Sequence, residues 1–239
     1  MPLPKISTSQ HELILPSTGK TVKYRPFLVR EEKVLILALE SKDPKQITNA
    51  IKQVLKDCIL TRGVKVEELP SFDIEYLFLN IRGKSVGESI DLIVTCGDDG
   101  KTTVPVTVYI DDIVVEKDPE HSTDISLGDY TLRMKYPSLQ QFVESSFGEN
   151  ADNNDIEGTF GIIASCIEMV FDEEEMWAAS DCTKKELREW IESLTSEQFN
   201  RIEKFFQTMP KLTHTITVTN PNTGNENSVV LEGLTDFFG

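Results

Sequence analysis

The order of the predicted secondary-structure elements occurs twice along this chain of 239 residues. Each half predicts an opening β-hairpin, a corner that joins a basic residue, an aromatic residue and a proline, about three helical segments, and a closing hairpin. The corners are Lys-Tyr-Arg-Pro at residues 23–26 and Lys-Tyr-Pro at residues 135–137. Two matched series of this length are typical of a tandem duplication. We therefore predict an α+β fold of two related units.

The division between the two units is expected at a polar segment, residues 116–123, which contains Pro119. This places an N-terminal repeat unit at residues 1–117 and a C-terminal repeat unit at residues 118–239. Pro105 cannot donate a hydrogen bond within a sheet, so its strand should lie at an edge. The first unit predicts a hairpin at residues 12–24, helices at 29–40, 44–59 and 70–81, and closing strands at 90–95 and 103–110.

The second unit predicts the same elements with extra residues inserted. Two capping boxes, Thr183 with Glu186 and Thr195 with Gln198, begin two of its helices. Cys58 and Cys166 lie at corresponding positions in apolar helical stripes of the two units. The remaining predictions are a hairpin at residues 124–135, helical segments at 139–147 and 162–171, a loop at 148–155, and closing strands at 214–219 and 227–231.

The formal net charge of −16 is unevenly distributed. Residues 1–117 hold 16 Lys and Arg against 17 Asp and Glu, whereas residues 118–239 hold 8 against 23. An acidic surface repels phosphate groups, which disfavours nucleic acid as a partner. The acidic half either meets basic surfaces of a partner protein or is simply well solvated.

The four cysteines and the apolar runs bear on the cellular compartment. No two cysteines form a C-x-x-C pair, and Cys58 and Cys166 are expected to be buried and reduced. No apolar run approaches the length of about 20 residues that spans a bilayer, so no membrane partner is expected. The first residues lack the apolar core of a signal peptide. We expect the protein to stay in the cytoplasm where it is made.

No catalytic or cofactor-binding residue is predicted. His11, His121 and His214 are scattered, and none has the local partners of a nucleophilic or metal site. The glycine-rich phosphate-binding motifs are absent from the sequence. The protein is therefore expected not to be an enzyme and to have no small-molecule substrate.

The predicted hairpin turn at residues 96–100, Cys-Gly-Asp-Asp-Gly, has the outline of a zinc knuckle. Position 99 is aspartate, however, and the matching turn at residues 220–224 has no cysteine. A structural zinc site needs four ligands, usually Cys or His, so no metal is predicted. The acidic run at residues 172–175 is a second candidate for a cation, but a solvated loop or helix end is the favoured interpretation.

Several stretches of the chain resemble the baseplate hub subunit, or hub assembly protein, of T-even-type contractile-tailed bacteriophages. Near the C-terminus the resemblance includes Phe205-Phe206, residues 209–212 and residues 230–238. The longer stretches are residues 15–33 (LPSTGKTVKYRPFLVREEK), 51–60 (IKQVLKDCIL) and 72–87 (FDIEYLFLNIRGKSVG).

This resemblance implies a structural component of the phage tail baseplate hub that acts through contacts with other hub and tail proteins, after assembly in the host cytoplasm. Two alternatives stay open: a transient assembly chaperone absent from the mature virion, and a nucleic-acid-binding module derived from a zinc-ribbon ancestor. Some proteins of this family carry paired cysteines at the two closing hairpin turns, whereas this chain keeps only Cys96.

The aromatic residues near the end of the chain, Phe237 and Phe238, are the candidate partner contacts. Buried aromatic side chains often dominate the energetics of protein interfaces. The alternative is that both residues pack onto their own domain.

Overall fold

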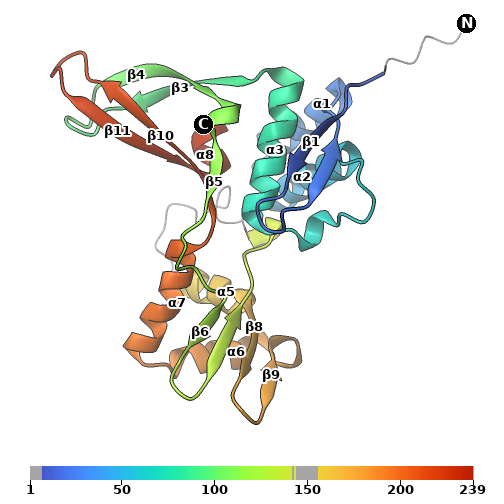
Figure 1. Cartoon of the computed structure of the whole chain (residues 1–239), viewed down its shortest axis with the longest axis vertical. Coiled ribbons are helices and arrows are strands. Elements are labelled where there is room, and N and C mark those ends of the chain that lie inside the picture. The colour runs from blue at the N-terminus through green and yellow to red at the C-terminus, as the bar shows by residue number, and fades with distance from the viewer. Residues whose placement is uncertain (1–6, 142, 144–155, 239) are drawn as a thin grey trace, which may run out of the picture. The chain divides into compact units, whose positions relative to one another are not determined.

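The structure, a computed structural model, describes residues 7–141, 143 and 156–238. They form helices and small antiparallel sheets, which confirms the predicted α+β fold (Figure 1). The chain forms two compact units. Unit 1 comprises Met1–Glu116 and Lys211–Gly239, and unit 2 comprises Lys117–Pro210.

Unit 1 begins with the predicted hairpin, in which β1 (His11–Ile14) pairs with β2 (Thr21–Tyr24). Helix α1 (Val29–Ser41) follows, and α2 (Pro44–Cys58) begins where the Asp43 carboxylate accepts the N–H of Lys45. Helix α2 ends at Cys58, one residue before the end of its predicted range, 44–59. Its predicted apolar stripe is buried and consists of Ile47, Ala50, Ile51, Val54, Leu55 and Cys58.

After the short helix η1 (Val66–Glu68), helix α3 runs over Ser71–Val86, longer than its predicted range of 70–81. Gly83 lies buried inside the helix. A Cβ atom at this position would be 2.7 Å from Cδ1 of Ile110, so glycine permits the close approach of η2 (Ile110–Asp112) to α3. The helix ends at Gly87, where φ is 154°.

Two hairpins complete unit 1. Strands β3 (Ser89–Thr95) and β4 (Thr103–Tyr109) form a two-stranded sheet, so Pro105 lies on an edge strand as predicted. A second sheet has the order β11-β10-β5. It consists of β5 (Val114–Glu116), β10 (Lys211–Thr219) and β11 (Glu226–Glu232), and the short helix α8 (Gly233–Phe238) follows.

The compact units differ from the predicted halves at the C-terminal end. The first boundary agrees to within one residue, but Lys211–Gly239 belongs to unit 1 rather than to the second unit. The reason is that β10 pairs with β5, with Leu212 opposite Val115. An isolated hairpin is marginally stable in water, and this third strand and the apolar surface beneath it stabilise the pair.

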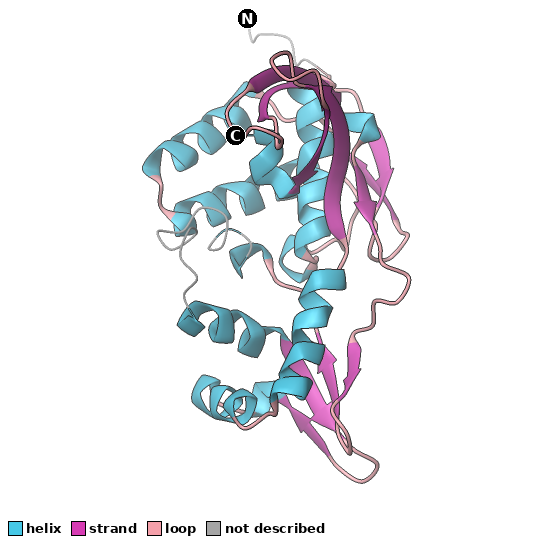
Figure 2. Ribbon diagram, turned by 90° about the vertical axis from the view of Figure 1, so that its left-hand side faces the viewer, coloured by secondary structure: helices cyan, strands magenta, loops and turns pink. Residues whose placement is uncertain are grey.

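Unit 2 contains a four-stranded antiparallel sheet in the order β6-β7-β8-β9. In Figure 2 its strands lie together on one side and its helices on the other. The strands are β6 (Asp124–Ser126), β7 (Thr131–Met134), β8 (Ile167–Phe171) and β9 (Met176–Ala178). The helices are α5 (Ile156–Cys166), η3 (Ala179–Asp181), α6 (Lys184–Glu192) and α7 (Ser196–Thr208).

Both capping boxes of unit 2 are confirmed. The Thr183 hydroxyl accepts the N–H of Glu186, and the Glu186 carboxylate accepts the N–H of Thr183; Thr195 and Gln198 repeat the arrangement. The core between sheet and helices includes Ile125, Leu127, Leu132, Met134, Ile163, Cys166, Ile167, Ile191, Ile202 and Phe205.

The prediction of a single helix over residues 162–171 is wrong. Helix α5 ends at Cys166, and Ile167–Phe171 forms strand β8. A short apolar run does not distinguish a buried helix from a buried strand, and here pairing with β7 decides, with Leu132 opposite Val170. Residues 139–141 and 143 are helical, while the rest of the predicted helix at 139–147 and the loop at 148–155 lie outside the described residues.

The two units share a local arrangement at the corner after their first hairpin. In unit 1 the N–H of Arg25 donates to the carbonyl of Cys58 at 3.0 Å, and in unit 2 the N–H of Lys135 donates to the carbonyl of Cys166 at 2.7 Å. Arg25 in unit 1 therefore corresponds to Lys135 in unit 2. The sequence had instead suggested that Lys23, two residues earlier, corresponds to Lys135.

The residues just before Arg25 and Lys135, and those just after Cys58 and Cys166, correspond as well. Tyr24 bridges to Ile59, and Met134 pairs with Ile167. On these paired contacts we propose that the two units descend from one duplicated unit.

All four cysteines are free thiols, and Cys58, Cys96 and Cys166 are buried. Burial raises the pKa of Cys58 and of Cys166 to about 11, so both are protonated near neutral pH. Within the described part of the chain, no helix has the length and apolarity needed to cross a membrane.

Candidate functional site

The closing hairpin turns of unit 1 bond to each other through polar side chains. The Asp98 carboxylate accepts hydrogen bonds from the Asn220 carboxamide at 2.8 Å and from the Thr223 hydroxyl at 2.5 Å. Its backbone N–H donates to the side-chain oxygen of Asn227 at 2.8 Å. We call this set of bonds the paired-turn contact. The hydrogen bonds from Thr223 and Asn220 lower the pKa of Asp98, which keeps it ionised.

The paired turns do not fit a zinc ion. The positions that a zinc ribbon would fill with Cys or His hold Cys96, Asp99, Asn220 and Thr223, and neither an amide nor a hydroxyl is a usual structural zinc ligand. The Asp99 carboxylate instead accepts the N–H groups of Lys101 and Thr102, at 3.0 Å and 2.9 Å. No group of three or more His, Cys, Asp or Glu that could hold a metal occurs among the residues described.

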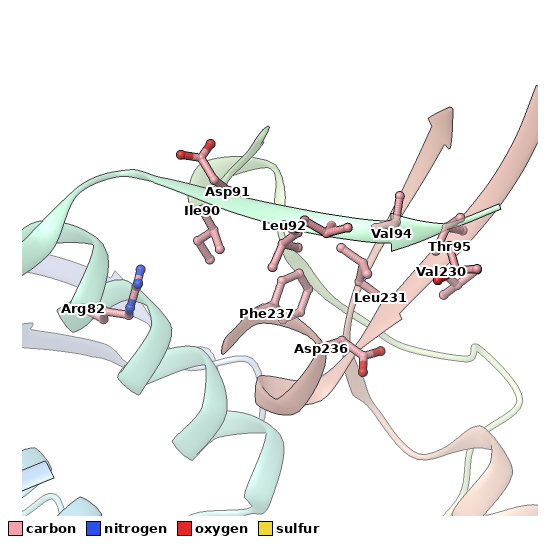
Figure 3. A pocket seen from close by; sticks show the side chains of 12 residues that line it. Arg82, Ile90, Asp91, Leu92, Val94, Thr95, Val230, Leu231, Asp236 and Phe237 are labelled. Atoms are coloured by element: carbon pink, nitrogen blue, oxygen red, sulfur yellow. The ribbon is translucent and has the colours of Figure 1, made fainter. Parts of the chain in front are cut away.

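Phe237, one of the two predicted partner contacts, is fully buried inside unit 1. It lies beneath β3 and beside β11, with its ring near Leu92 and Leu231 (Figure 3). The predicted alternative, packing onto its own domain, therefore describes Phe237, and its ring is not available to a partner. Phe238 is the last residue of α8, but its side chain lies outside the described part.

The three histidines lie in separate parts of the fold. His11 is in β1, with Nε2 at 3.0 Å from the Ser9 hydroxyl, and His214 is in β10. His121 lies in unit 2 between two hydroxyls: Nδ1 is 2.9 Å from Oγ1 of Thr208, and Nε2 is 3.0 Å from the phenol oxygen of Tyr136. His121 therefore links the entry of unit 2 to the end of α7.

The acidic run at residues 172–175 forms the turn between β8 and β9. The Asp172 carboxylate accepts the N–H groups of Glu174 and Glu175, at 2.8 Å and 2.7 Å, as in a turn-capping aspartate. Glu173, Glu174 and Glu175 are exposed. This agrees with the favoured interpretation of the run as a solvated loop.

The first exposed apolar surface lies on α1. Leu35 and Ala38 face the interior, but the residues beside them are also apolar and face solvent. Val29 is 80% exposed and Leu37 is 55% exposed. The α1 surface, as we call it, consists of Val29, Val34, Ile36, Leu37 and Leu39. Sequence reasoning did not single out this surface, although the unbroken apolar run Val34 to Leu39 is wider than one buried stripe requires and is a signal for it.

The second exposed apolar surface lies in unit 2, where the sheet meets α6. Trp177 is 42% exposed and Tyr130 is 45% exposed, and their rings meet edge to face with centroids 6.0 Å apart. Together with Trp190 they border a pocket of about 400 Å³. We call it the tryptophan pocket, since both tryptophans of the chain line it. Sequence reasoning missed this site, because its walls come from the turn before β7, from β8, β9 and η3, and from α6.

These features define an α+β protein with exposed apolar surface on both units. Its sequence matches the family model of the T4 bacteriophage base plate protein over residues 8–239, so the chain belongs to this family. It is therefore a structural protein of the phage tail baseplate, and such a protein contacts other baseplate proteins. No curated protein and no solved structure matches the chain significantly.

Proposed function

We propose that this protein is a structural component of the tail baseplate hub, which assembles in the host cytoplasm and joins its neighbours through protein–protein contacts. Membership of the base plate family supports the baseplate role. The hub assignment is supported by the resemblance of residues 15–33 and 72–87 to hub proteins.

The observation that carries the proposal is the α1 surface. Soluble monomers rarely expose a contiguous apolar patch without a binding role, because covering such a patch releases its hydration water and stabilises the complex. Five apolar side chains of one helix face solvent here, whereas the buried residues of α1 are Glu31, Leu35 and Ala38. A neighbouring baseplate protein would cover them.

The proposal includes no catalytic role. His11 and His214 lie in unit 1 and His121 in unit 2, and the hydroxyls beside His121 belong to Thr208 and Tyr136 rather than to a nucleophile with an acidic third partner. The buried thiols have raised pKa values, which makes them poor nucleophiles.

Nucleic acid is not the proposed partner. Unit 2 holds 8 Lys and Arg against 20 Asp and Glu, and unit 1 holds 16 against 20, so both units carry net negative charge. A net negative surface repels the phosphate backbone unless basic residues gather in one place. Salt-dependent binding of DNA by the isolated protein would favour the nucleic-acid alternative over this proposal.

The proposal is tested by the protein content of purified tails. Tails from infected cells are separated from unassembled protein by a density gradient, and the copies of this chain relative to other baseplate proteins are measured by mass spectrometry. A structural component is present in a fixed ratio in every preparation. A chain that is required for assembly but absent from finished tails would be an assembly chaperone, and the proposal would fail.

A further inference from the structure

We infer that the tryptophan pocket of unit 2 binds a basic segment of another baseplate protein, through one bulky apolar side chain flanked by lysine or arginine. This inference rests on the proposed structural role and adds the chemistry of one partner. The apolar walls of the pocket favour an apolar side chain, and the negative charge around its mouth favours basic residues beside that side chain.

The walls of the pocket are apolar and aromatic. Ile167, only 1% exposed, lines the pocket together with Leu187 and Trp190 of α6 and with Val170 and Trp177 of the sheet. A volume of about 400 Å³ is that of a small ligand site and is ample for one large apolar side chain. One lining residue is charged: Glu186, whose carboxylate accepts the N–H of Thr183.

The end of the sheet beside Trp177 is acidic. Strand β7 begins opposite the end of β8, since Thr131 pairs with Phe171, so the turn before β7 and the turn after β8 lie at the same end. The first turn contributes Asp129, and the second contributes residues 172–175. Trp177 and Tyr130, which touch across these two turns, therefore stand at the acidic end of the unit.

The acidic groups at this end are available to a partner. Glu173, Glu174 and Glu175 are exposed, and none of them forms an ion pair with another residue in the described part of the chain. On α6, by contrast, Lys185 pairs with Glu189 and Arg188 with Glu192. The unmatched negative charge at the turn favours lysine or arginine on the occupant and disfavours an acidic segment.

The pocket is built by elements that unit 1 lacks. After the matched pairs Tyr24–Ile59 and Met134–Ile167, unit 1 proceeds to α3 through a short loop and η1. Unit 2 instead continues β8 and adds β9, η3 and α6 before α7. These added elements supply Trp177, Leu187 and Trp190, so the second unit carries a binding site that has no counterpart in the first.

The experiment places a photo-crosslinking residue in the pocket of the full-length protein during infection. Trp177→p-benzoylphenylalanine is the main variant, and Tyr130→p-benzoylphenylalanine is the second in case the first does not fold. Lys185, on α6 with its side chain 84% exposed, is the control position. Infected cells are irradiated, and the crosslinked peptides are identified by mass spectrometry.

The expected result is one dominant crosslink from the pocket positions, absent from position 185, to a segment of another baseplate protein that carries a bulky apolar residue next to lysine or arginine. Glu174→Lys should lower the yield of this crosslink by about threefold or more, because it reverses a charge at the mouth. Glu203→Lys, an equal change on α7, should leave the yield unchanged, since α7 contributes no residue to the pocket.

Several results would overturn the inference: crosslinks to an acidic or uncharged segment, crosslinks to a second copy of this chain, a yield insensitive to Glu174→Lys, or no crosslink from either folded variant. Because the crosslink is read in whole infected cells, it does not depend on the presence of the protein in finished tails. Absence from tails would contradict the proposed structural role, whereas presence in tails without the crosslink would contradict only this inference.

Discussion

The carboxamide of Asn220 donates a hydrogen bond of 2.8 Å to the carboxylate of Asp98, and this bond joins the turns of two hairpins that stand far apart in the chain. The Asn220 side chain is fully buried and its oxygen also accepts the N–H of Asn222 at 2.8 Å. One amide thus shapes its own turn and holds the neighbouring turn. This polar contact stabilises the hairpin tips.

Asn220→Ala is expected to destabilise unit 1 by about 2–3 kcal/mol, because it removes the bond to Asp98 and leaves the N–H groups of Asn222 and Thr223 without their acceptor. The free energy of unfolding, measured by circular dichroism in urea, checks this value. Asn222→Ala is the control: Asn222 is exposed and donates one bond of 2.9 Å to the Thr102 hydroxyl, so its loss should cost about 0.5 kcal/mol. Equal effects of the two substitutions would contradict the importance of the buried amide.

Glu31→Gln is expected to destabilise unit 1 by about 2 kcal/mol at neutral pH, because the side chain of Arg25, 12% exposed, loses its ionised partner at 3.1 Å. Glutamine should fit, since Gln141 has the matching place in unit 2 and accepts the N–H of Ser138 as Glu31 accepts that of Leu28. The free energies of unfolding of the two proteins at neutral pH give the difference.

The same pair predicts a dependence on pH. Burial by itself would raise the pKa of Glu31, but hydrogen bonds from Arg25, Arg30 and the N–H of Leu28 lower it to about 2. The pKa is thus lower in the folded than in the unfolded chain, so this stabilisation is present above pH 4.5 and is lost as the pH falls toward 2. The difference between wild type and Glu31→Gln should shrink over this range, and a constant difference would contradict the ion pair.

Unit 2 is expected to lose stability as the pH falls below about 6.5, the ordinary pKa of histidine. Burial lowers the pKa of His121 and outweighs the opposite effect of Asp118, so the unfolded chain takes up a proton more readily than the folded one. Tryptophan fluorescence is a specific probe, because both tryptophans, Trp177 and Trp190, lie in unit 2.

The control for this prediction is His121→Phe. This substitution should lower the free energy of unfolding by about 1–2 kcal/mol at neutral pH, because the hydrogen bonds to Thr208 and Tyr136 are lost. It should also flatten the pH dependence of the unfolding midpoint between about pH 7.5 and pH 5.5. An unchanged slope would mean that another group is responsible.

Leu37→Lys is expected to change the stability by less than about 0.5 kcal/mol but to reduce the amount of this chain in purified tails severalfold. The side chain is 55% exposed, so lysine meets water in the free protein but would be buried in a complex. Leu35→Lys, two residues earlier and only 8% exposed, should instead unfold α1. If Leu37→Lys enters tails at the normal level, the α1 surface is not a contact of the baseplate.

Local signals in the sequence predicted much of the fold. The stripe of α2, the capping boxes at Thr183 and Thr195, and the edge position of Pro105 each depend on residues close together in the chain, and all three are confirmed. The end of α5 was not predictable in this way. Cys166 and Ile167 both belong to one apolar run, and only the partner strand β7 makes the second a strand residue.

The interaction sites, too, depend on contacts between distant parts of the chain. Phe237 was a candidate anchor for a partner because aromatic side chains often dominate the energetics of interfaces, but packing beneath β3 buries it. Sequence reasoning did not reveal the tryptophan pocket, since Tyr130, Trp177 and Trp190 come from three separate segments: the turn before β7, strand β9 and helix α6.

By itself the sequence determined the α+β class, the opening hairpins, most helix limits and the acidic character of the second half, because these follow from local periodicity, capping and charge. Only the tertiary structure decided that Lys211–Gly239 returns to unit 1, that Asp98 meets Asn220, and that unit 2 carries a pocket. These features depend on pairing between distant segments, such as Leu212 with Val115, whose free energy comes from surfaces that no local pattern records.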